Sequence, residues 1–261
     1  MKNYKISIIT VTKNSEKFLA QNISSVKSQN YKNYEHIIVD GNSVDKTIDI
    51  IKKCKGNIKL IKNKNDRGLY HAMNVGIKKS SGHIIGILNS DDVYFRNTLK
   101  TVNKYFNKYN NLDFLFGSVY KHKLLFGYNP NIINWSFGFY TTHSVGFFIK
   151  KKSQLKVGLY NLRYNYSADY DLFLRMIKKY KLKGLSTKKN EIFGKFRPGG
   201  LSSKINFLDY LIECNKIRLN NGQNLLVVYI IFILRILKNF KKIIKWIFIF
   251  VLFLVKKIIS F

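Results

Sequence analysis

Acidic residues are scarce in this chain of 261 residues, and proline is nearly absent. There are 14 Asp and Glu residues against 46 Lys and Arg residues, so the formal net charge is +32. Such a charge indicates an anionic partner, which can be nucleic acid, an anionic membrane face or a phosphorylated substrate. With two prolines the chain has no proline-rich linker, and its length fits one large domain, with or without an appendage.

Cysteine is also scarce, and Cys54 and Cys214 stand alone without a CxxC pair or metal-ligand spacing. This pattern argues against a disulfide framework and favours a reduced compartment. The N-terminal stretch MKNYKISIITVTKN has a short apolar core and no small-residue cleavage site, unlike a signal peptide. We therefore expect the bulk of the chain to stay in the cytoplasm.

Motifs of several common protein classes are missing. The segment after the first apolar run, TVTKNSEKF, contains no glycine, which excludes the GxGxxG turn of a Rossmann dehydrogenase. The chain also has no P-loop, HExxH, GxSxG or Cys/His cluster. No helix-turn-helix, zinc-finger or RNA-recognition signature is present and the basic residues are scattered, so we expect no nucleic-acid partner.

The first 120 residues alternate between strand and helix patterns. Short β-branched runs predict strands, and apolar residues at helical spacing predict helices. Asn14 and Ser15 are candidate N-caps of the first helix. This alternation is typical of a parallel, doubly wound α/β sheet. The predicted strands are 5–12, 35–40, 58–62, 83–88 and 113–119, and the later predicted helices are 47–51, 69–80 and 95–109.

The pattern after residue 120 is less regular. Residues 143–149 predict a further strand, and residues 167–180 have the pattern of an amphipathic helix. Ser167 is the candidate N-cap of that helix. The sequence RPGG at 197–200 predicts a turn or loop.

Four of the scarce acids follow predicted strands. Asp40 ends the second strand, Asp66 follows the third, and Asp91 and Asp92 follow the fourth. Ligands of such sheets bind beyond the carboxyl ends of the strands, so these acids predict a site for a cation or sugar hydroxyls. The alternative is that they serve as ordinary loop and helix-capping residues.

The C-terminal segment 221–261 differs from the rest of the chain. It contains the apolar runs LLVVYIIFIL and WIFIFVLFLV among basic residues, and no acid follows Glu213. A helix that spans a bilayer needs about 20 apolar residues, so we expect these runs to lie in the membrane interface instead. Lysines would meet anionic headgroups there, and Trp246 is a candidate anchor. The alternative is a helical pair that packs on the domain or on another subunit.

Five motifs occur in order along the chain: SIITVTKN (7–14), VDGNSVDKT (39–47), DRGLYHAMNVGI (66–77), LNSDD (88–92) and ADYDLFLR (168–175). In order and spacing they resemble the inverting family-two glycosyltransferases with the A-type, nucleotide-diphospho-sugar fold. The resemblance is strongest to the branch that builds bacterial polysaccharide, O-antigen and capsule, and it covers about residues 4–200. It implies a Rossmann-like, mostly parallel sheet flanked by helices, in a catalytic domain over 1–220. The nucleotide-binding half would span about 1–120 and the acceptor half about 121–220.

The resemblance implies a nucleotide pocket and a metal site. Mg²⁺ or Mn²⁺ would be bound by Asp91, in the place of the family's DxD motif. Asn89 stands where the family often has the first aspartate, and Asp92 is a candidate to compensate for it. A cation there would offset the charge that develops on the leaving diphosphate. The nucleotide-binding residues implied by the same motifs are Thr10, Val11, Thr12, Asp40, Asp66, Arg67, Ser90 and Asp91.

The resemblance also implies a general base in the motif ADYD. Asp169 corresponds to the base that deprotonates the acceptor hydroxyl while that oxygen attacks the anomeric carbon from the opposite face. Asp171 is the second candidate, and capping of the helix is the alternative for both. His143 matches a position near the acceptor in some relatives, although a lone histidine is more often structural.

Together these features predict an enzyme at the cytoplasmic face of the cell membrane, bound peripherally. It would move a sugar from a nucleotide donor, with UDP first and dTDP or GDP open, to a saccharide or polyprenyl-diphosphate-linked acceptor. Two other protein classes compete with this prediction. A nucleotidyltransferase would carry a basic, Gly-rich signature after the first strand, and a nucleic-acid-binding protein would use the charge of +32.

Overall fold

The computed structural model describes residues 2–54, 56, 58–135, 144–199 and 205–240. The main strands are β1 (Ile6–Thr12), β2 (Tyr34–Asp40), β3 (Ile58–Lys62), β4 (Ile84–Ile87), β6 (Phe114–Phe116), β9 (Phe147–Lys150) and β10 (Gly184–Ser186). The α-helices are α1 (Leu19–Lys27), α2 (Thr47–Lys53), α3 (Leu69–Lys79), α4 (Thr98–Lys108), α5 (Lys151–Val157), α6 (Ala168–Leu174), α7 (Phe207–Asn220) and α8 (Leu225–Lys238).

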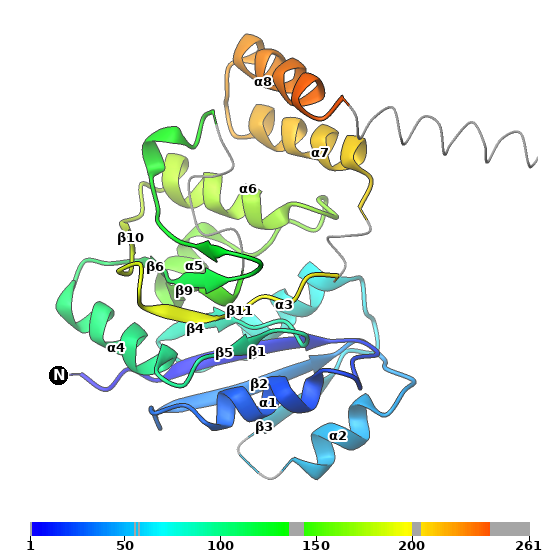
Figure 1. Ribbon diagram of the computed structural model, residues 1–261, viewed down its shortest axis with the longest axis vertical. Helices are drawn as coiled ribbons and strands as arrows, with labels where there is room; N and C mark the ends of the chain where they lie inside the picture. The colour runs from blue at the N-terminus through cyan, green and yellow to red at the C-terminus, as the bar shows by residue number, and fades with distance from the viewer. Residues whose placement is uncertain (1, 55, 57, 136–143, 200–204, 241–261) are drawn as a thin grey trace, which may run out of the picture.

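In the described part of the chain these strands form one seven-stranded sheet, in the order β10-β6-β9-β4-β1-β2-β3. Neighbouring strands are parallel, except that β9 runs antiparallel to both β4 and β6. Figure 1 shows α1 and α2 on one side of this sheet and α6 on the other. The predicted α/β fold with a mostly parallel sheet is therefore confirmed.

Alternating side chains of β1 supply the two layers of the core. Ile9 and Val11 pack on the side of α3, and Ile8 packs on the opposite side with residues of α1 and α4. A Cβ on Gly76 of α3 would lie 2.3 Å from Ile9 Cγ2, so this helix approaches β1 as closely as only glycine permits. The close packing fixes the first turn of α3 at the carboxyl edge of the sheet.

The single strand predicted at 113–119 is wrong, because the chain forms two strands there that belong to two different sheets. The strand is interrupted at Gly117, where a Cβ would lie 2.1 Å from Phe193 Cδ2. Before this break β6 stays in the large sheet, and after it the chain joins a four-stranded sheet. That sheet has the order β5-β11-β7-β8, made of β5 (Val93–Tyr94), β11 (Ile192–Lys195), β7 (Ser118–Tyr120) and β8 (Leu124–Leu125).

The predicted N-caps of the first helix are wrong. The cap of α1 is Phe18, and its side chain makes no capping bond. Asn14 has a φ of 48°, and its Oδ1 accepts a hydrogen bond of 2.9 Å from the backbone N–H of Val44. Asn14 therefore ties the loop after β1 to the loop after β2, which places both loops at one edge.

The helix predicted at 167–180 has two parts. It runs as α6 to Leu174 and continues as a π-helix over Arg175–Lys179, where the Tyr180 N–H donates to the Arg175 carbonyl at 2.9 Å. Ser167 does not cap it with its side chain, because the hydroxyl lies 3.5 Å from Cys214 Sγ of α7. The strand predicted at 143–149 begins later, as β9, after a 3₁₀ turn at Ser144–Gly146.

The C-terminal helices α7 and α8 form a hairpin at one end of the molecule, beyond α6 (Figure 1). The first apolar run of the tail is confirmed as helical, because it forms most of α8. The second run and Trp246 lie outside the described residues. Among the residues that the structure describes, no helix combines the length and apolar character needed to cross a bilayer.

Candidate active site

Loops from four strands meet at the carboxyl edge of the large sheet. Lys13, after β1, forms an ion pair of 3.0 Å with Asp66, after β3. The hydroxyl of Ser15 lies 2.8 Å from that of Ser90, after β4. The loop after β2 joins them through Asn14, as described above. The structure thus gathers the strand-end residues predicted from the sequence into one place, where ligands of parallel sheets bind.

Asp40 is buried at the end of β2, with 2% of its surface exposed. Its carboxylate accepts hydrogen bonds from the Ser43 hydroxyl at 2.5 Å and the Ser43 N–H at 3.1 Å. Thr12 lies opposite Asp40 in the parallel register. The buried Thr12 Oγ1 has no hydrogen-bond partner among the described residues. A buried hydroxyl in this state is suited to a polar group of a ligand.

Thr10 and Val11 lie further from the carboxyl end of β1 than Thr12. The Thr10 hydroxyl is fully buried, 2.9 Å from His36 Nε2 and 3.3 Å from Asn22 Oδ1. Burial lowers the pKa of His36 to about 3, so this ring is neutral and bonds as part of the core. Val11 packs in the core beside α3. Of the three predicted residues, the structure brings Thr12 to the end of the strand.

Asp66 lies between the loop after β2 and the start of α3. Its Oδ1 accepts from the Gly68 N–H at 3.1 Å, and a Cβ on Gly41 would lie 2.8 Å from its Oδ2. Only glycine at position 41 leaves room for this carboxylate. The neighbouring Arg67 is exposed, so its guanidinium is accessible to an anionic ligand.

The residues Asn89–Asp92 form a turn that α1 holds in place. The side-chain amide of Asn22 donates to the Asn89 carbonyl at 2.8 Å and to the Asp92 carbonyl at 2.9 Å. Asp92 is fully buried, whereas Asp91 is partly exposed. Burial raises the pKa of both carboxyls, and the charge of Asp91 raises that of Asp92 further. A cation beside this pair would offset both effects.

Arg197 is a cation that the sequence did not single out. Its backbone N–H donates to Asp92 Oδ1 at 3.1 Å, and its Nε donates to the Asp91 carbonyl at 3.3 Å. The guanidinium lies over the Phe18 ring, 4.0 Å from the centroid, and Nη2 donates to Gln21 Oε1 at 2.8 Å. The predicted turn after β11 thus delivers a fixed positive charge to the acidic turn. No local pattern in the sequence marks this residue.

The oxygen donors of the turn Asn89–Asp92 decide whether a metal ion fits there. No group of three or more His, Cys, Asp or Glu residues suited to a metal occurs in the described part of the chain. Asn89 Oδ1 is buried and accepts no hydrogen bond from a described residue, and the Asp91 carboxylate is partly exposed. Mg²⁺ is commonly held by one or two carboxylates together with water and substrate phosphates. Asp91 and Asn89 fit an ion completed by a phosphorylated ligand.

Asp169 is the second residue of α6 and is partly buried. Its Oδ1 accepts from the Tyr170 N–H at 2.9 Å and lies 3.3 Å from the Tyr70 hydroxyl of α3. Burial raises the pKa of this carboxyl, while the two hydrogen bonds act against that shift. A carboxylate with a raised pKa is a better proton acceptor, as a general base requires.

Asp171 has a different environment from Asp169. It is 4% exposed, and its Oδ2 forms an ion pair of 2.8 Å with Arg175 Nε. Its Oδ1 accepts from the side-chain amide of Asn221 in α7 at 3.1 Å. These bonds tie α6 to the π-helix and to α7. His143, the other predicted acceptor-side residue, lies outside the described residues.

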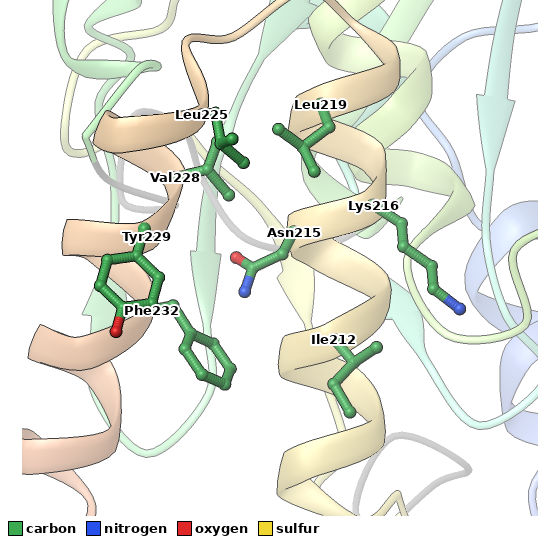
Figure 2. Close-up of a pocket in the computed structure, with 8 residues that line it drawn as sticks. All are labelled: Ile212, Asn215, Lys216, Leu219, Leu225, Val228, Tyr229 and Phe232. Atoms are coloured by element: carbon green, nitrogen blue, oxygen red, sulfur yellow. The ribbon is translucent and has the colours of Figure 1, made fainter.

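A second surface lies between α7 and α8. A groove of about 260 Å³ lies there. Its lining is mainly apolar, with side chains such as Ile212, Leu219 and Phe232, and Lys216 lies at its side (Figure 2). The solvent-exposed side of α8 is also apolar, and part of it borders this groove. Its large exposed side chains are Leu225, Leu226, Tyr229, Ile230, Ile233, Leu234 and Leu237, followed by Phe240. So much exposed apolar surface in one place marks an interaction site.

Solved structures share this fold. The crystal structure of S. aureus TarS 1-349 in complex with UDP-GlcNAc superposes with a TM-score of 0.67 over 82% of this chain and 66% of that one, at 18% identity. Mannosyltransferase PcManGT from Pyrobaculum calidifontis, in complex with GDP-Man and Mn²⁺, gives 0.63 over 84% and 63%, at 14% identity. At these identities the likeness shows an A-type glycosyltransferase fold and nothing finer.

The family follows from the sequence match. The model of Glycosyl transferase family 2 matches residues 7–179, and the chain belongs to this family. The E. coli enzyme UDP-Glc:alpha-D-GlcNAc-diphosphoundecaprenol beta-1,3-glucosyltransferase WfgD is 34% identical over 119 residues, 45% of this chain and 47% of that protein. A PGL/p-HBAD biosynthesis glycosyltransferase of Mycobacterium tuberculosis is 29% identical over 175 residues, 65% of this chain and 68% of that protein. The match thus spans about half the length of the E. coli relative.

Proposed function

We propose that this protein transfers a sugar from a nucleotide-diphosphate sugar to a saccharide or lipid-linked acceptor in surface polysaccharide synthesis. The observation that carries the proposal is that Asp40, Asp66 and Asp91 lie at one edge of the sheet. Helix α3 begins at this edge and contacts Asp169. The loop of Asp66 leads directly into α3, whose Tyr70 contacts Asp169. The proposed donor pocket and the proposed proton acceptor are thus both positioned by α3.

The donor would bind through its nucleotide at the strand ends. Carboxylates such as Asp40 and Asp66 accept hydrogen bonds from a base N–H or from ribose hydroxyls. Thr12 offers a buried hydroxyl, and the exposed Arg67 offers a positive charge. UDP is the proposed nucleotide because the E. coli relative is named for UDP-Glc, and dTDP and GDP are the competitors.

The diphosphate would lie at the turn Asn89–Asp92. Asp91 and Asn89 would hold Mg²⁺ or Mn²⁺ there, and the ion would supply electrostatic stabilisation of the leaving diphosphate. Arg197 holds a positive charge beside the same turn and can serve the same leaving group. Asp92 is fully buried and accepts from the Arg197 backbone, so it fixes the position of that arginine.

The proposed reaction is a single displacement with Asp169 as base. The acceptor oxygen attacks the anomeric carbon while Asp169 takes the proton of that hydroxyl. The bond between the anomeric carbon and the diphosphate oxygen breaks, and its electron pair leaves with the nucleoside diphosphate. Attack opposite the leaving group inverts the configuration. The ion pair of Asp171 with Arg175 supports Asp169, rather than Asp171, as the proton acceptor.

The acceptor would come from an anionic membrane at its cytoplasmic face. The exposed apolar face of α8 supports this, because such a face can enter the headgroup and acyl boundary. Every charged residue after Glu213 is Lys or Arg, which favours anionic lipid over an acidic protein surface. The name of the E. coli relative, which includes a diphosphoundecaprenol acceptor, supports a polyprenyl-diphosphate acceptor here. The association would be peripheral.

A panel of radiolabelled nucleotide sugars, incubated with the protein and a membrane extract, tests this proposal. We expect label from one donor to move into the lipid fraction, and thermal-shift assays to show stabilisation by the matching nucleoside diphosphate with Mn²⁺. A protein that binds no nucleoside diphosphate and transfers no label contradicts the proposed function.

A further inference from the structure

We infer that Glu213 of α7 is a positioning residue for the proposed base Asp169. The inference rests on the proposed function, and it adds a role for a helix that lies beyond the matched family region of 7–179. Glu213 does not contact a reacting atom in this account. It acts by holding the chain segment from which α6 begins.

The carboxylate of Glu213 accepts three backbone hydrogen bonds in a row. Its Oε2 accepts from the Asn165 N–H at 2.7 Å, and its Oε1 accepts from Tyr166 and Ser167 at 2.8 and 2.7 Å. Hydrogen bonds to an ionised acceptor are stronger than those between neutral groups. A single side chain therefore fixes three consecutive peptide groups that end two residues before Asp169.

These bonds hold the segment before α6, and they do not replace the side-chain cap predicted for Ser167, because the first N–H groups of the helix lie further along the chain. The Ser167 side chain makes no capping bond to α6 and faces Cys214, also of α7. The start of α6 is thus oriented by two adjacent residues of another helix. The position of this segment therefore depends on how α7 packs against it.

The same segment is held from its other side by Tyr70. The Tyr70 hydroxyl lies 3.1 Å from the Tyr166 carbonyl and 3.3 Å from Asp169 Oδ1, so it can donate to either. Residue Tyr166 is therefore fixed at its N–H by Glu213 and at its carbonyl by the hydroxyl that also contacts Asp169. A change at Glu213 should move the carboxylate of Asp169 relative to α3 and the donor pocket.

Glu213 also acts on Asp169 through its charge. The negative charge of Glu213 raises the pKa of Asp169, as a minor contribution after burial. Replacing Glu213 with glutamine removes that charge, so the pKa of Asp169 falls. A base is active when deprotonated, and the acidic limb of the rate profile would then move to lower pH.

The test compares Glu213→Gln with Asp209→Asn, which removes an exposed charge from the same helix. We expect Glu213→Gln to lower kcat by about 10- to 100-fold, since small misplacements of a catalytic group have effects of this size. The KM for the donor should stay unchanged, and the acidic limb should shift downward in pH. Glu213→Asp, which keeps the charge, should restore the pH profile. Asp209→Asn should change none of these quantities.

Hydrogen exchange gives a readout that does not depend on activity. In Glu213→Gln the amides of Asn165, Tyr166 and Ser167 should exchange faster, while amides of the β1 strand stay protected. Should that variant fail to fold, Glu213→Asp is measured for the same exchange at these amides. A wild-type protein that transfers no sugar overturns the proposed function. Wild-type transfer with kcat, pH profile and exchange all unchanged in the variants overturns the role of Glu213 alone.

Discussion

The hydroxyl of Tyr70 lies 3.3 Å from Asp169 Oδ1 and joins the first turn of α3 to the first turn of α6. The first turn of α3 also carries the end of the Asp66 loop, so one tyrosine connects the proposed donor pocket with the proposed base. This contact makes the ionisation of Asp169 dependent on α3, and it leads to a test by pH.

Replacing Tyr70 with phenylalanine should move the acidic limb of the kcat profile to higher pH. The Tyr70 hydrogen bond lowers the pKa of Asp169, so its removal raises that pKa above its already elevated position. The base is then protonated, and inactive, at a higher pH than in the wild type. Tyr120→Phe, at the exposed end of β7, serves as the control. An unchanged or downward-shifted limb in Tyr70→Phe would rule out this coupling.

Changes at the turn after β4 should alter the response to metal in opposite directions. Asp91→Asn should abolish the stabilisation by UDP with Mn²⁺ in a thermal-shift assay, because it removes the proposed carboxylate ligand. Asn89→Asp adds a carboxylate and should allow activity at lower Mn²⁺ concentration. The exposed Asp49, changed to asparagine, is the matched control. Equal metal dependence in all three variants would refute a cation site at this turn.

Arg197→Ala should lower kcat by about 100-fold, the size expected when one fixed group that stabilises a leaving charge is lost. The structural reason is that Arg197 is held over Phe18 and bonded to the Asp91 carbonyl, so its charge is fixed beside the turn. Arg197→Lys should restore little of the rate, since lysine cannot reproduce the stacking and the directed N–H bonds together. Arg163→Ala removes an exposed arginine elsewhere and should leave the rate unchanged.

The double variant Ile230→Asp, Leu234→Asp should weaken binding to vesicles that contain anionic lipid. Each change removes an exposed apolar side chain of α8 from the proposed membrane face, and each loss corresponds to about tenfold in affinity. Co-sedimentation with the vesicles measures the effect. Leu155→Asp, at an exposed position of α5, controls for a charge placed elsewhere. Equal co-sedimentation of the double variant and wild type would argue that α8 meets another partner.

The strands β1 to β4 and the acids at their ends could be predicted because short apolar runs and strand-end acids are local signals. The interruption between β6 and β7 at Gly117 could not be predicted, since it depends on the Phe193 ring that packs against that backbone. Arg197 was missed for the same reason, because only the pairing of β11 with β5 brings it to the acidic turn. Tertiary contacts decide these features, and a local pattern does not encode them.

The motif ADYD shows the same division between local and distant information. The sequence placed Asp169 and Asp171 together in one first turn. The structure keeps both in the first turn of α6 and gives them different partners, because Arg175 one turn later pairs with Asp171 while Tyr70 from α3 contacts Asp169. Ser167 is the N-cap residue of α6 without a side-chain capping bond, and Glu213 of α7 holds the segment just before the helix, a contact that no local pattern in the sequence signals.

Sugar transfer by Asp169→Asn, measured beside donor binding, tests the central claim most directly. The change keeps the shape of the side chain and removes the proton acceptor. We expect transfer to fall by about 10²- to 10⁴-fold, the usual contribution of a general base, while UDP binding stays as in the wild type. Asp171→Asn should instead lower thermal stability, because it leaves the Arg175 charge without its carboxylate. Undiminished transfer by Asp169→Asn would contradict the account.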